Sequence, residues 1–542
     1  MKKLLLLPLS LLLLGGGAQA QQSNPHQHGG EPCLYHHAIE QTAQTHPYYR
    51  QAVEEAFRTA QRAGEAERGN RNTLVIPVVV HVVWRQAAEN LPLATIQEQI
   101  DILNEDYQRL NPDTSRLRSI FQPIVANPQI QFRLDSVIYR QTDSIFTSTG
   151  LFPDLNVTNK VKRDCNGGDD AWDVTRYLNI WVCNLGSSGV LGFAYPPADL
   201  SNWPAGSAAP SLGLEGVVLD YRIVGRSGSI SLNGTTITTQ GRSATHEVGH
   251  YLGLRHIWGD GPLAVFGIND CSGNDGVNDT PTAGRGSNFQ CDTMQNTCGS
   301  GTLGDLPDMI ENYMDYSTES CMNSFTQGQV DIMRGTLSST GYRYPLTQNS
   351  TFNRAPANDK AAAATLATVN TDNNCTILAQ GTTQHAHPSY HINQCSGSDY
   401  TGADVWFEFT APNSEVTIDL LNVSAAQGAS TAMVAELLNG ECANSQGQAQ
   451  LRACISTFPH TQSSLTVGNT YFLRLYSANA ADRQNFSLCL KSNGTEVGVE
   501  RALALDWAIF PNPNAGRFTL QVPADLPAAS RLNIYNALGK NI

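Results

Sequence analysis

The feature that most constrains this chain is one string near its middle, His246-Glu247-Val248-Gly249-His250-Tyr251-Leu252-Gly253-Leu254-Arg255-His256. Two histidines four residues apart lie on one face of a helix, so their neutral imidazoles can bind the same cation. Gly253 can adopt the left-handed conformation that ends a helix, which lets His256 approach as a third ligand. Three imidazoles leave the fourth position of a zinc ion open, as in catalytic sites, and Glu247 can reach a metal-bound water as general base.

Two plainer interpretations of this string compete with a catalytic zinc site. The first is a helix whose histidines are solvated or packed in a core. The complete spacing argues against it, because a chance match is expected in about one in 10⁴ chains of this composition or fewer. The second is a degenerate site that binds zinc without catalysis, and the string alone does not exclude it.

The N-terminus predicts export. Lys2 and Lys3 precede an apolar run from Leu4 to Leu14, and Ala18-Gln19-Ala20 has the pattern of a signal-peptidase site. The run is too short to span a bilayer and no later stretch is long enough, so we expect no membrane span. The 12 cysteines of an exported chain are expected to form disulfides. The net charge of −14 argues against nucleic acid as a partner.

The hydrophobic pattern predicts an α+β domain followed by all-β modules. Residues 74–84 read as a buried strand, 93–110 as a helix, and 130–137 and 177–182 as further strands. After about Tyr344 the sequence pattern changes to short β-like segments separated by turn residues, which is typical of a β-sandwich. The predicted organisation is a signal peptide (1–20), a propeptide (21–72), the α+β domain (73–345), a linker (346–355), a β-sandwich (356–492) and a partial C-terminal domain (503–542).

A second motif gives a family resemblance. Glu311-Asn312-Tyr313-Met314-Asp315-Tyr316 resembles the Met-turn of the metzincin zinc proteases, and the segments 177–185, 216–221 and 256–260 are similar to the short bacterial pappalysins of the cytophagalysin and ulilysin type. The resemblance covers about residues 73–345. It implies a metzincin fold and a zinc endopeptidase acting on proteins or peptides. By this resemblance Met314 supports the three histidines, Glu247 is the catalytic base and Tyr316 stabilises the oxyanion.

The resemblance also bears on the loop between the two motifs. Asp, Asn and Gly residues crowd positions 270–279, which suits calcium but also a polar solvated loop. The short pappalysins carry calcium here, which implies Asp275 and the Thr280 carbonyl as ligands. Four cysteines of this region allow three pairings, and the family's spacing favours Cys271 with Cys298 and Cys291 with Cys321. A Cys165–Cys183 bridge is a further expectation.

Cys33 lies in the predicted propeptide near four histidines. A thiolate at this place could occupy the open zinc position and hold the enzyme latent. The surrounding Glu31-Pro32-Cys33-Leu34 does not reproduce a cysteine-switch motif, so an acidic residue in that role and a solvated leader remain alternatives.

Substrate preference and the trailing modules are less constrained. By the resemblance, members that cleave before lysine or arginine carry an acidic residue after the Met-turn. The corresponding position here is Ser320, with Glu319 beside it, so the sequence assigns no cleavage-site preference. Residues 356–492 resemble the bacterial pre-peptidase C-terminal sandwich, either a binding module or a spacer. The end resembles the start of a type IX secretion sorting domain, which implies contact with secretion machinery and a location outside the cell. An exported adhesion protein with a vestigial zinc helix, or a zinc enzyme acting on non-peptide substrates, are the rival functions.

Overall fold

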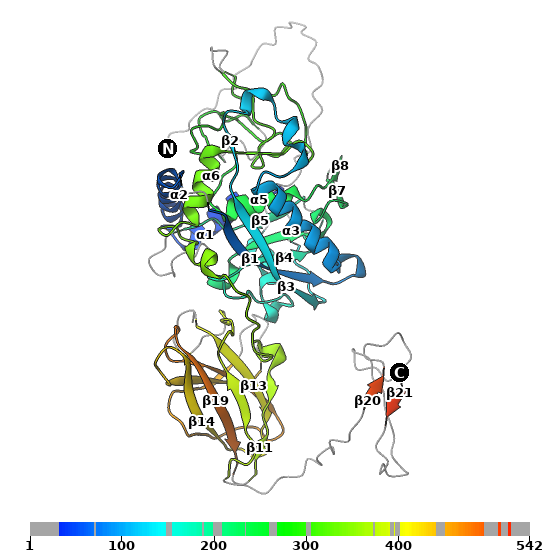
Figure 1. Ribbon diagram of the computed structural model, residues 1–542. Coiled ribbons are helices and arrows are strands. Elements are labelled where there is room, and N and C mark those ends of the chain that lie inside the picture. The colour runs from blue at the N-terminus through cyan, green and yellow to red at the C-terminus, as the bar shows by residue number, and fades with distance from the viewer. Residues whose placement is uncertain are drawn as a thin grey trace, which may run out of the picture.

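The computed structural model describes most of the chain between Pro32 and Ser492 and one strand pair beyond it (Figure 1). The predicted signal peptide lies outside the described residues, as does most of the predicted sorting domain, of which only β20 (Ala508–Phe510) and β21 (Thr519–Gln521) are described. Within the described part of the chain, no helix is long and apolar enough to cross a membrane. The described residues are 32–69, 72–147, 154–186, 189–198, 209–232, 235–259, 268–299, 305–371, 374–390, 395, 402–440, 450–492, 508–510 and 519–521.

A five-stranded sheet forms the centre of the first domain, in the order β3-β1-β4-β6-β5. The inner strand β1, between β3 and β4, is the continuous apolar run that the sequence predicts as buried, and its residues 76–83 are all buried. The strand pairs β1–β3, β1–β4 and β4–β6 are parallel, whereas the edge strand β5 pairs antiparallel with β6. The strands are β1 (Leu74–Trp84), β3 (Ile130–Gln141), β4 (Leu178–Cys183), β5 (Gly192–Ala194) and β6 (Val217–Asp220).

Three helices follow in the same domain. The predicted helix 93–110 is α3 (Leu93–Tyr107), which ends earlier because Arg109 takes a positive φ of 51°. The short α5 (Arg242–Tyr251) carries the motif histidines and packs against α3, β5 and β6. Helix α6 (Gln327–Thr336) follows the Met-turn. The remaining short elements are α4 (Leu155–Thr158) and the strand pairs β2 (Val125–Ala126) with β9 (Phe325–Thr326) and β7 (Ser229–Leu232) with β8 (Thr235–Thr238).

The segment predicted as a propeptide folds against this domain as two helices. They are α1 (Tyr35–Thr45) and α2 (Tyr49–Ala66), and α2 lies alongside α6 (Figure 1). The place where the propeptide ends stays a prediction.

The part of the chain from β10 to β19 consists of two β-sheets that share one apolar core, and we call it the two-sheet body. One sheet has the order β10-β13-β18-β15-β16 and the other β11-β19-β14-β17, with β12 also paired to β19. Residues of both sheets, such as Phe407 and Leu488, meet in this core, so two facing sheets account for the alternating pattern. The strands are β10 (Thr365–Leu366), β11 (Val369–Asn370), β12 (Ala379–Thr382), β13 (Asp404–Thr410), β14 (Val416–Gln427), β15 (Met433–Leu438), β16 (Leu451–Ile455), β17 (His460–Gln462), β18 (Thr470–Ser477) and β19 (Arg483–Lys491).

The two-sheet body contacts the first domain through specific side chains. Lys360 Nζ pairs with Asp169 Oδ1 at 2.9 Å, and the His387 ring stacks on Trp172 at 4.3 Å.

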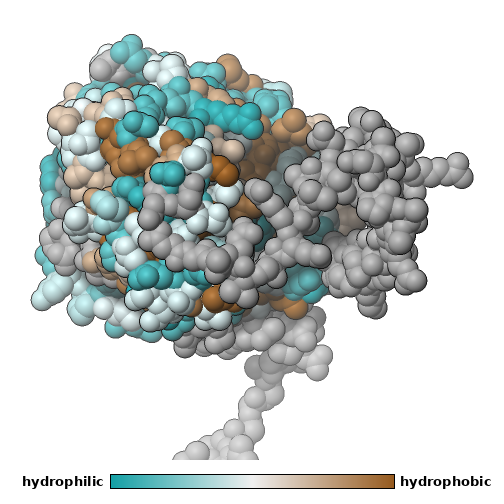
Figure 2. Space-filling model, turned by 90° about the horizontal axis from the view of Figure 1, so that it is seen from below, coloured by the Kyte–Doolittle hydropathy of each residue, from teal (hydrophilic) through white to brown (hydrophobic). Residues whose placement is uncertain are grey.

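The space-filling view from below shows hydrophobic residues only in small patches between hydrophilic ones on the face that it draws (Figure 2). The apolar surface of the described residues that this view shows is therefore divided rather than gathered in one large area.

Four disulfides join described residues. Cys271–Cys298 and Cys291–Cys321 confirm both predicted pairings, and Cys375–Cys489 and Cys395–Cys454 lie in the two-sheet body. The expected Cys165–Cys183 bridge is wrong, because Cys183 is a free thiol buried in β4. Nearness in sequence does not bring two Cβ atoms to bonding geometry when one side chain is fixed by a buried strand.

Candidate metal centre

Helix α5 and the turn after it bring three imidazoles to one point. The helix ends after Tyr251, and Gly253 takes a φ of +99°, as the sequence predicts. The Nε2 atom of His246 lies 3.0 Å from that of His250 and 3.2 Å from that of His256, and the last two are 3.1 Å apart. Three converging imidazole nitrogens are a donor set that fits zinc.

The other ring nitrogens of two of these histidines fix how the rings point. His246 Nδ1 lies 2.7 Å from the Tyr313 carbonyl, and His250 Nδ1 lies 2.9 Å from the Leu254 carbonyl. A carbonyl only accepts, so each Nδ1 donates its proton and Nε2 keeps a lone pair for a metal. Burial and the neighbouring rings of His256 and His246 lower the pKa of His250 well below its usual value. The His250 ring is therefore held in the neutral form that ligates metal.

The predicted propeptide reaches the same point. Ligand atoms of Cys33 and the three histidines all lie within 4.8 Å of one another. Cys33 is buried, and its thiol donates to Glu247 Oε2 at 3.4 Å. Its backbone forms a parallel bridge with Gly192 of β5, where Leu34 N donates to the Gly192 carbonyl at 3.1 Å. The Tyr35 ring stacks on His250 at 4.0 Å.

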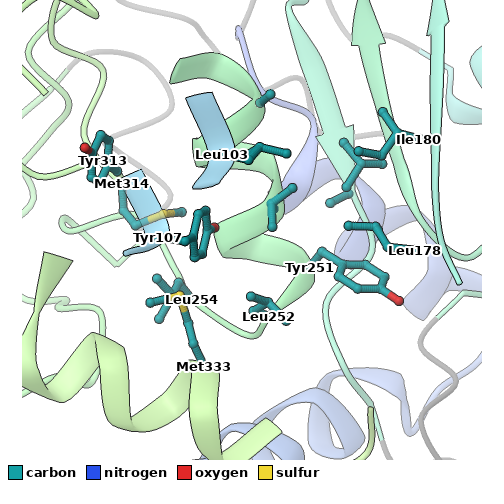
Figure 3. Packing of buried hydrophobic residues seen from close by; sticks show 14 of the residues in the cluster. Leu103, Tyr107, Leu178, Ile180, Tyr251, Leu252, Leu254, Tyr313, Met314 and Met333 are labelled. Atoms are coloured by element: carbon teal, nitrogen blue, oxygen red, sulfur yellow. The ribbon is translucent and has the colours of Figure 1, made fainter. Parts of the chain in front are cut away.

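The Met-turn residues lie next to the histidines. Met314 is buried in the main apolar core beside Leu254 and Tyr107 (Figure 3). A Cβ on Gly249 would come within 2.5 Å of Met314 Sδ, so a larger residue at this position would have to displace the Met314 side chain. The Tyr316 ring lies 4.8 Å from His256 and 5.6 Å from His246. Both predicted supporting residues are thus brought to the site.

A buried carboxylate that the sequence did not single out joins the helix to the Met-turn. Asp106 of α3 accepts from Tyr313 Oη and from Thr245 Oγ1, each at 2.7 Å. Burial raises the pKa of Asp106 to about 6. Since the Tyr313 carbonyl accepts from His246, Asp106 holds the partner of a metal-site histidine. The contacts span more than 130 residues of sequence, so no local pattern could reveal them.

Glu319 caps the N-terminus of α5. The N-cap residue of that helix is Gly241, which offers no side-chain cap. Instead Glu319 accepts from the backbone N–H groups of Gln240, Arg242 and Ser243, and from the Ser243 hydroxyl. Glu319 is buried, whereas the neighbouring Ser320 is exposed. The acidic side chain beside the predicted specificity position therefore points to the helix rather than to solvent.

The predicted calcium loop buries acidic oxygens. Asp275 is buried, and burial raises the pKa of its carboxyl to about 7. Among the described residues, Asp275 Oδ2 and Asp279 Oδ1 have no hydrogen-bond partner. Thr280, the next residue in the sequence, is also buried. Buried carboxylate oxygens without partners are costly unless a cation is bound. The donor set therefore fits a hard cation such as calcium.

Comparisons with known proteins give the class. Residues 162–338 match the profile of Peptidase_M43, described as pregnancy-associated plasma protein-A. Extracellular metalloproteases of Trichophyton verrucosum and Arthroderma benhamiae are each 31% identical over 260 residues, which is 48% of this chain and 75% of theirs. A solved promirolysin mutant of Tannerella forsythia is 33% identical, with coverage of 60% of this chain and 100% of that one and a TM-score of 0.49. The chain is a metalloprotease by its sequence relatives. It belongs to the M43, or pappalysin, family.

Proposed function

We propose that the chain is a secreted zinc-dependent endopeptidase of the metzincin type, made as a latent zymogen. The observation that carries this proposal is the convergence of the three Nε2 atoms, with Glu247 beside them and Cys33 within ligand distance. Zinc would be held by His246, His250 and His256. Export is supported by the signal-like N-terminus, the disulfides and the extracellular relatives.

Zinc in this position would polarise a peptide carbonyl and acidify water. Glu247 accepts the proton of the attacking water and passes it to the leaving amine, since its carboxylate lies beside the open side of the histidines. Tyr316 donates a hydrogen bond to the oxyanion of the tetrahedral intermediate. Met314 fills the apolar space behind the ligands, and Asp106 holds the turn that carries it.

Latency is assigned to Cys33. Its thiolate would take the zinc position that water needs, while its backbone covers the edge strand β5. Tyr35 stacked on His250 closes the same side of the site. Support for this role comes from the burial of Cys33 and from its contact with Glu247, the residue proposed as base.

Two substitutions test the activity and its latency. Glu247→Ala should abolish peptide cleavage while zinc stays bound, and turnover retained by that variant would overturn the mechanism. Cys33→Ala should make the uncut proenzyme active, measured on a peptide library. Cys183→Ala is a matched control, since Cys183 is also a buried cysteine but lies in β4 and not at the metal centre. A Cys33→Ala proenzyme as latent as the parent would exclude the thiol.

The remaining assignments extend the same proposal. Calcium is assigned to the loop of Asp275 and Thr280, where it would neutralise buried oxygens and stabilise the fold. We assign residues 356–492 to the pre-peptidase C-terminal type of sandwich, and the C-terminal segment to recognition by secretion machinery. Ser320 supplies no acidic group, so no preference for cleavage before lysine or arginine is proposed.

A further inference from the structure

A second contact area, separate from the metal centre, holds the N-terminal segment on the catalytic domain. The C-terminal half of α2, which packs on α6, carries three small residues at every fourth position. This spacing places them on one side of a helix and allows close approach of a second helix. These residues are Ala56, Ala60 and Gly64, and all three are buried.

The two helices touch backbone to backbone. A Cβ on Gly64 would lie 1.8 Å from the Asp331 carbonyl oxygen of α6. Conversely, a Cβ on Gly335 of α6 would lie 1.8 Å from the Ala60 carbonyl oxygen of α2. Neither helix therefore admits even one methyl group at the crossing, which makes the contact specific for these two surfaces.

Charged contacts flank the crossing on both sides. Arg255, within the metal-binding motif, pairs with Glu54 at 2.6 Å and lies over the Phe57 ring at 3.9 Å. At the other end, Arg68 Nε donates to Asp331 Oδ2 at 2.7 Å. The partners on the catalytic domain, Arg255 and Asp331, have opposite charges, so they also fix the direction in which α2 docks.

We propose that α6 and Arg255 form an exosite that binds the α2 segment of the propeptide independently of Cys33. A propeptide severed before Thr73 then stays bound through α2 and keeps Cys33 at the metal centre, so cleavage at that junction alone does not activate the enzyme. The connection between α1 and α2 contains Tyr48, which is 76% exposed, and is accessible to a further cut. The consequence for activation rests on the proposed latency, whereas the exosite does not.

The binding arm of the test uses the full chain, zinc-loaded, with Glu247→Ala to prevent self-digestion. Residues 69–72 are replaced by the recognition sequence of a specific protease, the protein is cut, and the fragments are separated by size-exclusion chromatography. We expect the propeptide fragment to coelute with the remainder, and with Cys33→Ser as well. A fragment that separates at once after cutting overturns the exosite.

Three variants within the propeptide sharpen this arm. Gly64→Ala favours helix formation intrinsically, so a loss of binding can only come from the clash with α6. For Gly64→Ala we expect the cut propeptide fragment to bind the remainder of the chain at least tenfold more weakly. Glu54→Gln removes one charge without a clash, and its fragment should also bind more weakly. Ala66→Leu, at an exposed position of the same helix, is the matched control and should be retained like the parent. Equal retention of all three variants overturns the exosite.

The activity arm uses the same cut site with Glu247 intact. The nicked parent should stay latent, and nicked Gly64→Ala should gain activity on dilution. A nicked parent that is fully active while its fragment coelutes would uphold the exosite and overturn the latency assignment. The failure of one proposal is thus distinguished from the failure of the other.

Discussion

Replacing Glu319 with alanine should weaken the helix that carries His246 and His250 by about 4 kcal/mol. Glu319 accepts from three backbone N–H groups at the start of α5, where Gly241 provides no side-chain cap. A buried N–H without an acceptor costs about 1 kcal/mol or more, and loss of a negative charge at a helix N-terminus costs about 1 kcal/mol. Three such groups and the charge give about 4 kcal/mol, which is near the upper end for a single substitution.

Amide hydrogen exchange of residues 242–251 measures this change directly, because it reports the opening of one helix in a multidomain chain. The measurement uses the full chain with Glu247→Ala. Glu319→Gln keeps the side-chain volume and one acceptor oxygen, so we expect about half the effect. Ser320→Ala, at the exposed neighbouring position, should leave the exchange unchanged.

The opposite outcome has a definite form. If Glu319→Ala leaves exchange in α5 unchanged but alters the preference for lysine or arginine after the scissile bond, Glu319 faces the substrate and the capping role is wrong. A Glu319→Ala variant in which both the protection of α5 from exchange and the cleavage preference change would also contradict the capping role. The carboxylate of Glu319 would then act on the substrate as well as on the helix.

Three further predictions concern buried charges. Asp106→Asn should weaken zinc affinity about tenfold in chelator competition, because an amide cannot accept both hydrogen bonds, whereas Asp101→Asn on the exposed side of α3 should not. Burial lowers the pKa of Lys162 to about 7. The unfolded chain binds the extra proton between pH 7 and about 10, so stability should rise with pH there, and Lys162→Met should remove up to about 5 kcal/mol of that rise in urea unfolding. Removal of calcium by dialysis should lower the melting temperature more at pH 8 than at pH 5.5, because the carboxyl of Asp275, with its pKa near 7, must lose its proton to bind calcium. An equal or reversed difference would contradict the calcium site.

The parts of the site that the sequence predicts are those encoded by local spacing. His246, His250 and His256 lie within eleven residues, and the backbone rules for a helix and a terminal glycine suffice to bring them together. The buried strand β1 was predictable for the same reason, since a continuous apolar run needs cover on both faces.

The parts that it does not predict depend on contacts between distant residues. Asp106 meets Thr245 and Tyr313 across 139 and 207 positions, and Glu319 reaches α5 from beyond the Met-turn. An acidic residue in a sequence carries no sign of whether it will be buried or which donors will surround it. The expected Cys165–Cys183 bridge is wrong for a similar reason, because the local sequence does not show that Cys183 is a free thiol buried in β4.

The orientation of Cys33 links latency to the way a substrate would bind. The Cys33 backbone pairs in parallel with the edge strand β5, and Leu34 N uses the Gly192 carbonyl, an acceptor that an extended substrate on that edge would also need. The Cys33 segment therefore lies on the strand edge as well as at the metal centre. Docking of α2 on α6 acts on both contacts at once. It keeps the Cys33 thiol near the histidines and the Cys33 backbone near β5 at a high local concentration.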